Sequence, residues 1–135
     1  MADFNLLGAG GAFKAKLLNL RHARQEVIAA NVANADTPGY KAKRLDFESE
    51  LAQAYPANGE LAMARTDGQH LPIAPTNFEP MIQEVETAIP KGDGNSVDLE
   101  QEMARQTANQ LLYNYAAQSL SGQISQMRMI IGGGR

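Results

Sequence analysis

The chain has 135 residues, of which 44% are hydrophobic and 20% are charged. This size and composition are ordinary for one soluble domain. The sequence contains no cysteine, which excludes disulfide bonds, thiol chemistry and cysteine-based metal sites. Its formal net charge is −3, and we do not expect it to bind nucleic acid, because that affinity depends on Lys and Arg neutralising phosphates.

Neither a membrane span nor a cleaved secretory signal is expected. No apolar run approaches the ~20 residues that a helix needs to cross a bilayer. Residues 1–11 lack a basic opening followed by a long apolar core. Taken alone, composition therefore favours a cytosolic protein.

An amphipathic helix is predicted from about residue 5 to residue 33. Glycines at positions 8, 10 and 11 weaken its first turns, because each costs roughly 1 kcal/mol against alanine in a helix. We expect the first dozen residues to be mobile in a free monomer. One face of the helix is apolar at spacings of three and four: Phe13, Leu17, Leu20, Ala23, Val27 and Ala30.

The helix is followed by an asparagine-rich corner at residues 30–41. Pro38 and Gly39 fit the two central positions of a type II turn, and Pro38 disfavours a helical Thr37, so the helix must end before that residue. Short polar side chains are placed to bond the free backbone groups at the helix end. The corner motif comprises Asn31, Asn34, Asp36, Thr37, Pro38, Gly39 and Tyr40.

The middle of the chain, residues 34–95, is predicted to be irregular. All six prolines lie between positions 38 and 90, which argues against helix throughout this region. Short strands are expected around residues 44–51 and 82–89, and residues 91–95 are interpreted as a hinge or linker.

A second long helix is predicted from Asp98 to Ile131. Asp98 is the expected N-cap, with Gln101 reaching back as in a capping box, and the glycines at 132–134 end the helix. One stripe repeats every seven residues: Leu99, Met103, Gln106, Gln110, Tyr113, Ala117, Leu120, Ile124, Met127 and Ile131. The two glutamines either set register or face a polar neighbour.

These elements define a mainly α fold. A helix from residue 98 to 131 is about 50 Å long, longer than a compact globule of this size, so its stripe needs a long partner. We expect residues 1–33 and 96–135 to form one elongated, coiled-coil-like hairpin, with Phe13, Leu17, Leu20 and Val27 packed against the stripe. Apolar residues off the stripes indicate neighbours from other subunits; they include Leu18, Ile28, Leu111, Leu112 and Tyr115.

No arrangement of residues predicts catalysis. The two histidines, His22 and His70, are the groups with an ordinary pKa near neutrality, and neither belongs to a catalytic constellation. No metal-ligand spacing is present. We therefore predict that the chain is not an enzyme, with no catalytic, metal-binding or cofactor-binding residue and no cofactor.

Two segments together resemble a known family. Residues 18–21, 24–42 and 45–47 are similar to the amino-terminal signature of bacterial flagellar rod and hook proteins. Residues 94–103 are similar to the segment that opens the carboxy-terminal helix of the same family. Residues 50–93 carry no such resemblance.

The resemblance implies a structural subunit of the proximal rod of the flagellar basal body. Such a subunit leaves the cytoplasm through the flagellar type III export apparatus, acts in the periplasm, and packs its helices into an axial tube that transmits torque. Its implied partners are copies of itself, neighbouring rod proteins, the junction protein at the rod base and the export apparatus. The apolar positions assigned to assembly are Phe13, Leu17, Leu20, Val27, Leu99, Met103, Tyr113, Leu120, Ile124, Met127 and Ile131.

Two alternatives stay open. The chain is either another proximal rod subunit of the same family, or, from a different class, a soluble helical adaptor or chaperone that binds partner helices through its methionine-containing stripe. The sequence does not specify the number of subunits per turn or which neighbour each face contacts.

Overall fold

The computed structural model describes residues 8–54, 80–85 and 92–133. In chain order these residues form α1 (Gly8–Ala33), β1 (Lys43–Leu45), α2 (Glu48–Ala54), β2 (Ile82–Glu84) and α3 (Leu99–Ile131). The predicted fold class is confirmed, since two long helices flank a short-stranded, irregular middle. The 33 residues of α3 make a helix about 50 Å long at the usual rise of 1.5 Å per residue.

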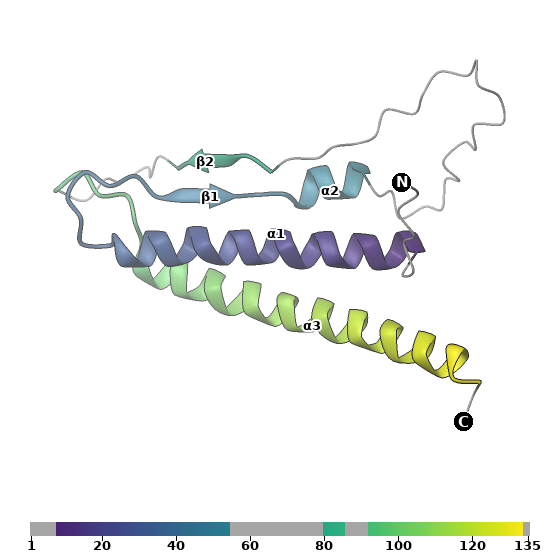
Figure 1. Cartoon of the computed structure of the whole chain (residues 1–135). Coiled ribbons are helices and arrows are strands. Elements are labelled where there is room, and N and C mark those ends of the chain that lie inside the picture. Colours follow the sequence, from purple (N-terminus) through teal and green to yellow (C-terminus); the bar gives the residue numbers. More distant parts are fainter. Residues whose placement is uncertain (1–7, 55–79, 86–91, 134–135) are drawn as a thin grey trace, which may run out of the picture.

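The elements form three layers with α1 in the middle. Figure 1 shows β1, β2 and α2 along one side of α1, and α3 along the other. The two long helices run in opposite directions and diverge away from the corner (Figure 1). The strands pair antiparallel, with Lys43 opposite Glu84 and Leu45 opposite Ile82. Because α1 has neighbours on two sides, it contributes two different faces to the fold.

The hydrophobic core lies between α1 and the middle segment. Its buried members are Leu20, Val27, Leu45, Phe47 and Leu51, and the half-buried Phe13, Leu17 and Ala23 pack against them. The expected intramolecular packing of this α1 face against the α3 stripe is therefore wrong. Phe47, fully buried just before α2, and its two leucine neighbours supply the apolar cover that the prediction assigned to α3.

The face of α3 that turns towards α1 is largely polar. Its buried residues are Glu102, Asn109 and Ala116, which are seven residues apart and so share one side of the helix. Near the far end of the pair, the Lys14 ammonium donates to Gln123 Oε1 at 3.1 Å. The fully buried contacts between the two long helices are thus mainly polar, and the first half of the apolar stripe is not part of them.

Many large apolar side chains of α3 are consequently left uncovered. Tyr113, Leu99 and Met103 of the predicted stripe are 38%, 44% and 56% exposed, whereas Leu120, Ile124 and Met127 are half-buried. We use the term uncovered residues of α3 for the following set: Leu99, Met103, Leu111, Leu112, Tyr113, Tyr115, Met129, Ile130 and Ile131.

The middle segment differs from its prediction in one element. The strand expected at residues 44–51 ends at Leu45, and Glu48–Ala54 is helical instead. Glu48 and Glu50 lie in the first turn of α2, where carboxylates interact favourably with the helix dipole. The second expected strand is present as Ile82–Glu84; its remainder at 86–89, the first residues of the amino-terminal helix and His70 lie outside the described residues.

Candidate functional site

The corner begins where α1 ends, at Ala33, as predicted. The Asn34 backbone N–H donates to the Ala30 carbonyl at 3.2 Å, and its side-chain Nδ2 donates to the same oxygen at 2.8 Å. Asn34 therefore caps a carbonyl that the helix itself leaves without a partner. It does so without the left-handed conformation, which only glycines adopt among the described residues.

The predicted type II turn is present at Thr37–Tyr40. Gly39 has a φ of +71°, and the Tyr40 N–H donates to the Thr37 carbonyl at 3.2 Å. Both features define the turn, because its third position requires a positive φ and its first carbonyl accepts from the fourth N–H. Pro38 occupies the second position, where its fixed φ is suited.

Replacing Gly39 with alanine is expected to weaken the corner by about 1–2 kcal/mol, because a Cβ disfavours the left-handed backbone. Amide hydrogen exchange of Tyr40 should become roughly 5- to 30-fold faster. Gly122→Ala is the matched control, because open space surrounds a Cβ at either position but Gly122 does not have a positive φ. Unchanged exchange at Tyr40 in Gly39→Ala would contradict the turn assignment.

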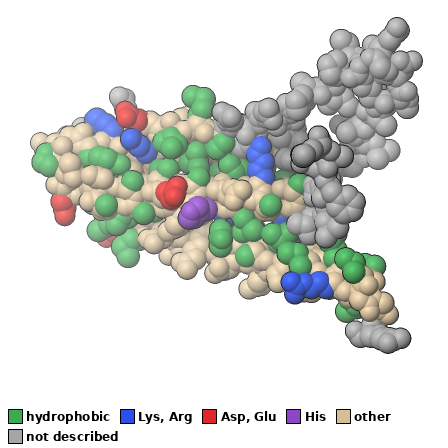
Figure 2. Space-filling view, in the orientation of Figure 1, with side chains coloured by type: hydrophobic (Ala, Val, Ile, Leu, Met, Phe, Trp, Pro, Cys, Tyr) green, Lys and Arg blue, Asp and Glu red, His purple; other side chains and the backbone are tan. Residues whose placement is uncertain are grey.

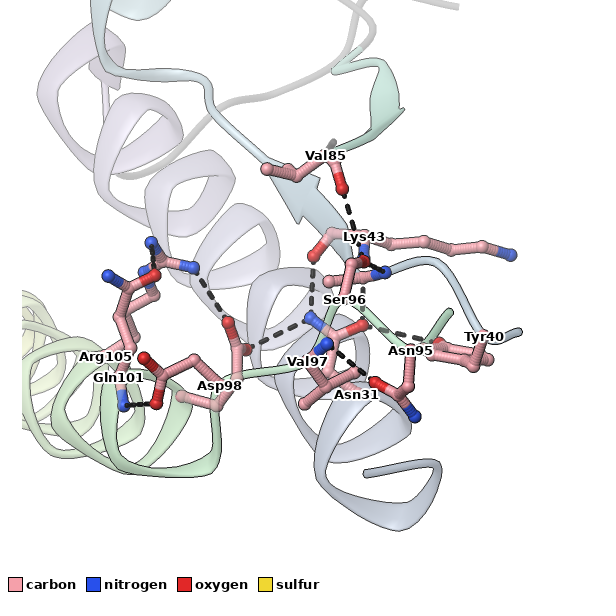
Figure 3. Close-up of polar contacts among 12 residues, drawn as sticks. Asn31, Tyr40, Lys43, Val85, Asn95, Ser96, Val97, Asp98, Gln101 and Arg105 are labelled. Atoms are coloured by element: carbon pink, nitrogen blue, oxygen red, sulfur yellow. Dashed lines mark hydrogen bonds and ion pairs between the residues drawn. The ribbon is translucent and has the colours of Figure 1, made fainter. Parts of the chain in front are cut away.

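Asn31 is the buried centre of the corner (Figure 3). Its side chain is completely inaccessible to solvent. Nδ2 donates to the Lys43 carbonyl at 2.7 Å and to Glu102 Oε2 at 3.0 Å, while Oδ1 accepts from the Lys43 N–H at 2.9 Å and the Tyr40 hydroxyl at 3.3 Å. One amide thus joins α1 to β1 and α3, with its hydrogen-bonding capacity used.

Asn95 is a second fully buried amide, and it ties the returning chain to the end of α1. Its Nδ2 donates to the carbonyls of Asn34, Ala35 and Thr37 at 2.9, 3.0 and 2.8 Å. Its Oδ1 accepts from the Val97 N–H at 2.7 Å. The interpretation of residues 91–95 as a hinge is therefore wrong at its carboxy-terminal end, because Asn95 is held by hydrogen bonds from both sides.

Backbone bonds extend this connection along the corner. The Gly39 N–H donates to the Asp93 carbonyl, and the Ser96 N–H donates to the Tyr40 carbonyl, both at 3.0 Å. The Ser96 hydroxyl accepts from the Ala42 N–H at 2.7 Å and donates to the Val85 carbonyl at 3.3 Å. The corner, the start of β1 and the segment before α3 consequently form one hydrogen-bonded unit.

The first turn of α3 completes the unit. Asp98 is the N-cap, as predicted, and its carboxylate accepts from the Gln101 N–H at 3.1 Å. The Gln101 side chain does not close a capping box; it accepts from Arg105. Arg105 also donates to Glu102 Oε1 at 2.7 Å. Glu102 is only 3% exposed, and this pairing supplies the compensation that a buried carboxylate requires.

Further along the helices, Asn109 joins α3 to the polar side of α1. Its Nδ2 donates to the Arg21 carbonyl at 2.9 Å and to Gln25 Oε1 at 3.2 Å. Gln106 and Gln110, the polar positions in the predicted stripe, line a groove beside these groups. Both glutamines therefore lie beside polar neighbours, which is one of the two roles considered for them.

Arg24 fastens α2 to the opposite side of α1. Its guanidinium lies 4.2 Å from the centre of the Phe47 ring, donates to the Leu45 carbonyl at 2.8 Å, and makes two bonds to the Glu48 carboxylate. Partial burial acts to raise the pKa of Glu48, but hydrogen bonds and charge from Arg24 outweigh it and lower that pKa below its ordinary value. The Glu48 carboxylate is therefore ionised at neutral pH.

The structure brings most of the predicted corner residues together and adds residues that periodicity did not find. Asp36 lies exposed. The missed members are Asn95, Ser96, Glu102 and Asn109. Because these residues are polar, a search for apolar periodicity does not detect them. The spacing of seven between Glu102 and Asn109 nevertheless indicates a second, polar stripe on α3. Residues 95–102 do fall inside the segment of family resemblance.

The chemistry of this site is structural. Within residues 8–54, 80–85 and 92–133, no group of three His, Asp or Glu side chains is arranged to hold a metal ion. His22 lies on the surface, 3.6 Å from Glu26. No helix in the described ranges is both long and apolar enough to cross a membrane. The site's polar groups bond to backbone and to one another, and so fix the directions in which three segments leave the corner.

Comparison with known proteins defines the class to which this fold and corner belong. A family model described as flagella basal body rod protein matches residues 18–41, which comprise the second half of α1 and the corner. The chain is also similar to several curated rod proteins over nearly its whole length.

A flagellar basal body rod protein FlgB from Escherichia coli K12 is 40% identical over 95% of this chain and 96% of its own length. The FlgB of Salmonella typhimurium LT2 is 36% identical over the same shares. That of Bacillus subtilis 168 is 30% identical over 91% of this chain and 98% of its own length. The chain belongs to the FlgB family of flagellar basal body rod proteins.

Proposed function

We propose that this chain is a structural subunit of the proximal rod, exported by the flagellar type III apparatus and assembled by helix packing into an axial tube that transmits torque. Family membership supports the rod assignment. The observation that carries the mode of assembly is the uncovered apolar surface of α3, since no other described element covers it within one chain.

This surface is large for a single helix. Leu111, Tyr115 and Ile130 are 70%, 74% and 78% exposed, and hydrophobic side chains appear on the surface along α3 in Figure 2. Burying one such side chain contributes roughly 1.5–3 kcal/mol, so several buried together supply a substantial association free energy. Exposed apolar patches of this kind mark sites of protein–protein contact.

In this proposal, residues 1–33 and 96–135 line the tube and residues 34–95 form the outer segment. The corner sets the angle between them. Asn31 bonds to Tyr40, β1 and α3, and Asn95 ties the segment before α3 to the end of α1, so the angle is determined inside each subunit before neighbours are contacted. Every copy then presents the same shape, as a regular polymer requires.

The proposed partners are further copies of the chain, neighbouring rod proteins, the junction protein at the rod base and the export apparatus. The proposed assembly residues are those of the α1 core face and the α3 stripe. The α1 members also pack within the subunit, so their contribution to assembly is support of the fold, whereas uncovered α3 residues such as Met103 contact neighbours directly.

The purified monomer is expected to contain less helix than the structure and to gain helix on assembly. From Ala117 onwards every described residue of α3 is exposed or only half-buried, so this half has little of the packing that stabilises a long helix in water. Circular dichroism should record low helicity for the monomer and a rise in the polymer, with hydrogen exchange locating the gain at the helix ends. A fully helical, sharply melting monomer at low concentration would contradict the proposal.

The alternative function is that of a cytosolic helical adaptor or chaperone, which predicts a stable folded monomer or dimer outside the flagellum. Isolation of basal bodies separates the two functions. The proposed function requires the chain to be a stoichiometric component of the isolated rod, and its absence there would exclude a structural role.

A further inference from the structure

A cleft of about 230 Å³ opens between α1, β1 and α3, beside the corner. It is formed mainly by residues that the proposed function does not use. Its cationic lining residues outnumber its acidic ones, which are Asp46 and Glu102; the cationic residues are Arg21, Arg24, Lys43, Arg44 and Arg105.

Two of the arginines have their charge compensated within the chain. Arg24 is paired with Glu48 and Arg105 with Glu102. The other two differ, because in the described part of the chain the Nε atoms of Arg21 and Arg44 are buried and have no hydrogen-bond partner. A buried donor without a partner costs free energy that a suitable acceptor recovers.

The environment of Arg21 strengthens this point. Its side chain is 7% exposed, and its guanidinium reaches Asn109 Oδ1 only at 3.5 Å. Desolvation lowers the pKa of Arg21, against the opposing charge of Glu48, and nearby Arg24 lowers it further. A second carboxylate close to these guanidinium groups would stabilise their charged form.

The rim of the cleft is partly apolar. Val27 and Ile28 line its α1 side, and Leu112 of α3, which is 44% exposed, lines the other. Leu112 is itself one of the uncovered residues of α3, so the cleft borders that apolar surface. A partner that packs on α3 is therefore brought to the cleft.

We propose that the cleft receives a carboxylate side chain from a second copy of this chain. The inference rests on the proposed function, because it requires subunits to pack side by side. Five of the chain's 12 Lys and Arg residues line the cleft but only two of its 15 Asp and Glu residues, which leaves seven cationic and thirteen acidic residues elsewhere. In the described part of the chain, eight acidic residues and four cationic ones lie outside the cleft, and all eight acidic residues are exposed, Glu84 and Glu100 among them. The described surface that a second copy presents is thus acidic.

A carboxylate suits the two arginines in geometry as well as charge. Guanidinium groups bind carboxylates through two parallel N–H donors, and such charge-assisted bonds are stronger than neutral ones. The charged contact orients the neighbouring subunit. The apolar surface of α3, which lies beside this contact, supplies most of the association free energy.

Photo-crosslinking in isolated basal bodies tests the inference. Benzoylphenylalanine replaces Ala108, which is exposed and lines the cleft, and mass spectrometry identifies the cross-linked peptide. We expect a link between two copies of the chain, at a peptide containing Asp or Glu. A link to a different protein, a link only within one chain, or no link in rods that contain the chain would overturn the inference.

Charge variants in the same background test the role of the arginine. Arg44→Gln should lower the yield of the cross-link at least tenfold or keep the subunit out of rods, whereas Arg44→Lys should retain at least half of it. Lys41→Gln is the matched control, because it removes the same charge from an exposed corner position. Equal effects of the two Arg44 variants, or of Lys41→Gln, would contradict the inference; absence of the unsubstituted chain from basal bodies would instead contradict the proposed function.

Discussion

Replacing Leu111 with aspartate is expected to abolish rod assembly and swimming while leaving the folded subunit intact. Leu111 is 70% exposed and is two residues from the buried Asn109, which places it about 200° around the helix, away from α1. The change costs the subunit little but puts a carboxylate into an apolar contact between subunits. Losing the leucine alone removes roughly 1.5–3 kcal/mol per contact, and burying the charge costs more.

Motility plates and electron microscopy of isolated basal bodies measure this effect, and hydrogen exchange at the corner checks the fold. Ser49→Asp is the charge control, because it adds the same charge at an exposed position of α2, on the side of α1 opposite α3, and it should leave assembly intact. Normal swimming with Leu111→Asp would refute the assembly role of this side of α3. Leu120 and Ile124 are weaker test positions, because they are already half-buried.

The change Asn95→Asp is expected to open the corner. It replaces the amide that donates to three carbonyls with a group that has no donor when ionised. Three carbonyls then lose their donor and face a buried negative charge, at a cost of about 3–5 kcal/mol. Hydrogen exchange at Tyr40 and Ser96 should become more than 100-fold faster, and rods should fail to form.

Asn114→Asp provides the matched control, because it makes the same substitution at an exposed position of α3. It should leave exchange at the corner unchanged. If Asn95→Asp preserved both slow exchange and rod assembly, the three carbonyl bonds would contribute little, and the corner would not be the element that fixes the angle.

Local rules account for the parts of the structure that were predicted correctly. The end of α1, the turn at Gly39 and the N-cap at Asp98 each depend on a few consecutive residues. Proline and glycine restrict backbone angles directly, and an aspartate before a helix accepts a nearby N–H. Such features can be predicted from a single sequence because the interacting groups lie within one turn of each other.

The partner of each apolar face was not predictable in the same way. Periodicity showed that α1 has an apolar face, but it could not choose between α3 and the region around Phe47 as its cover. Phe47 lies in the segment expected to be a strand, and that expectation does not say which helix face the segment covers. The sequence likewise predicts a strand instead of the short helix α2, because Leu51 is the one large apolar residue of that helix and does not define a helical period.

The polar members of the site escaped prediction for a related reason. The burial of Asn95 and Glu102 depends on atoms distant in sequence as well as near ones: the Asn95 bonds to carbonyls span about sixty residues and the Asn31–Glu102 bond spans 71. Their types alone favour a surface location. The family resemblance included both residues, but it carries no account of what they contact.

The polar contact between α1 and α3 fixes the axial position of one helix relative to the other. Two long helices joined by smooth apolar surfaces tolerate sliding past one another, since one leucine replaces another after a turn. Amide and carboxylate groups do not, because a shift of one turn, about 5.4 Å, separates Glu102 from Asn31 and Asn109 from Arg21. The axial stagger of the two helices is therefore fixed within each subunit, so the proposed assembly would receive copies of one length.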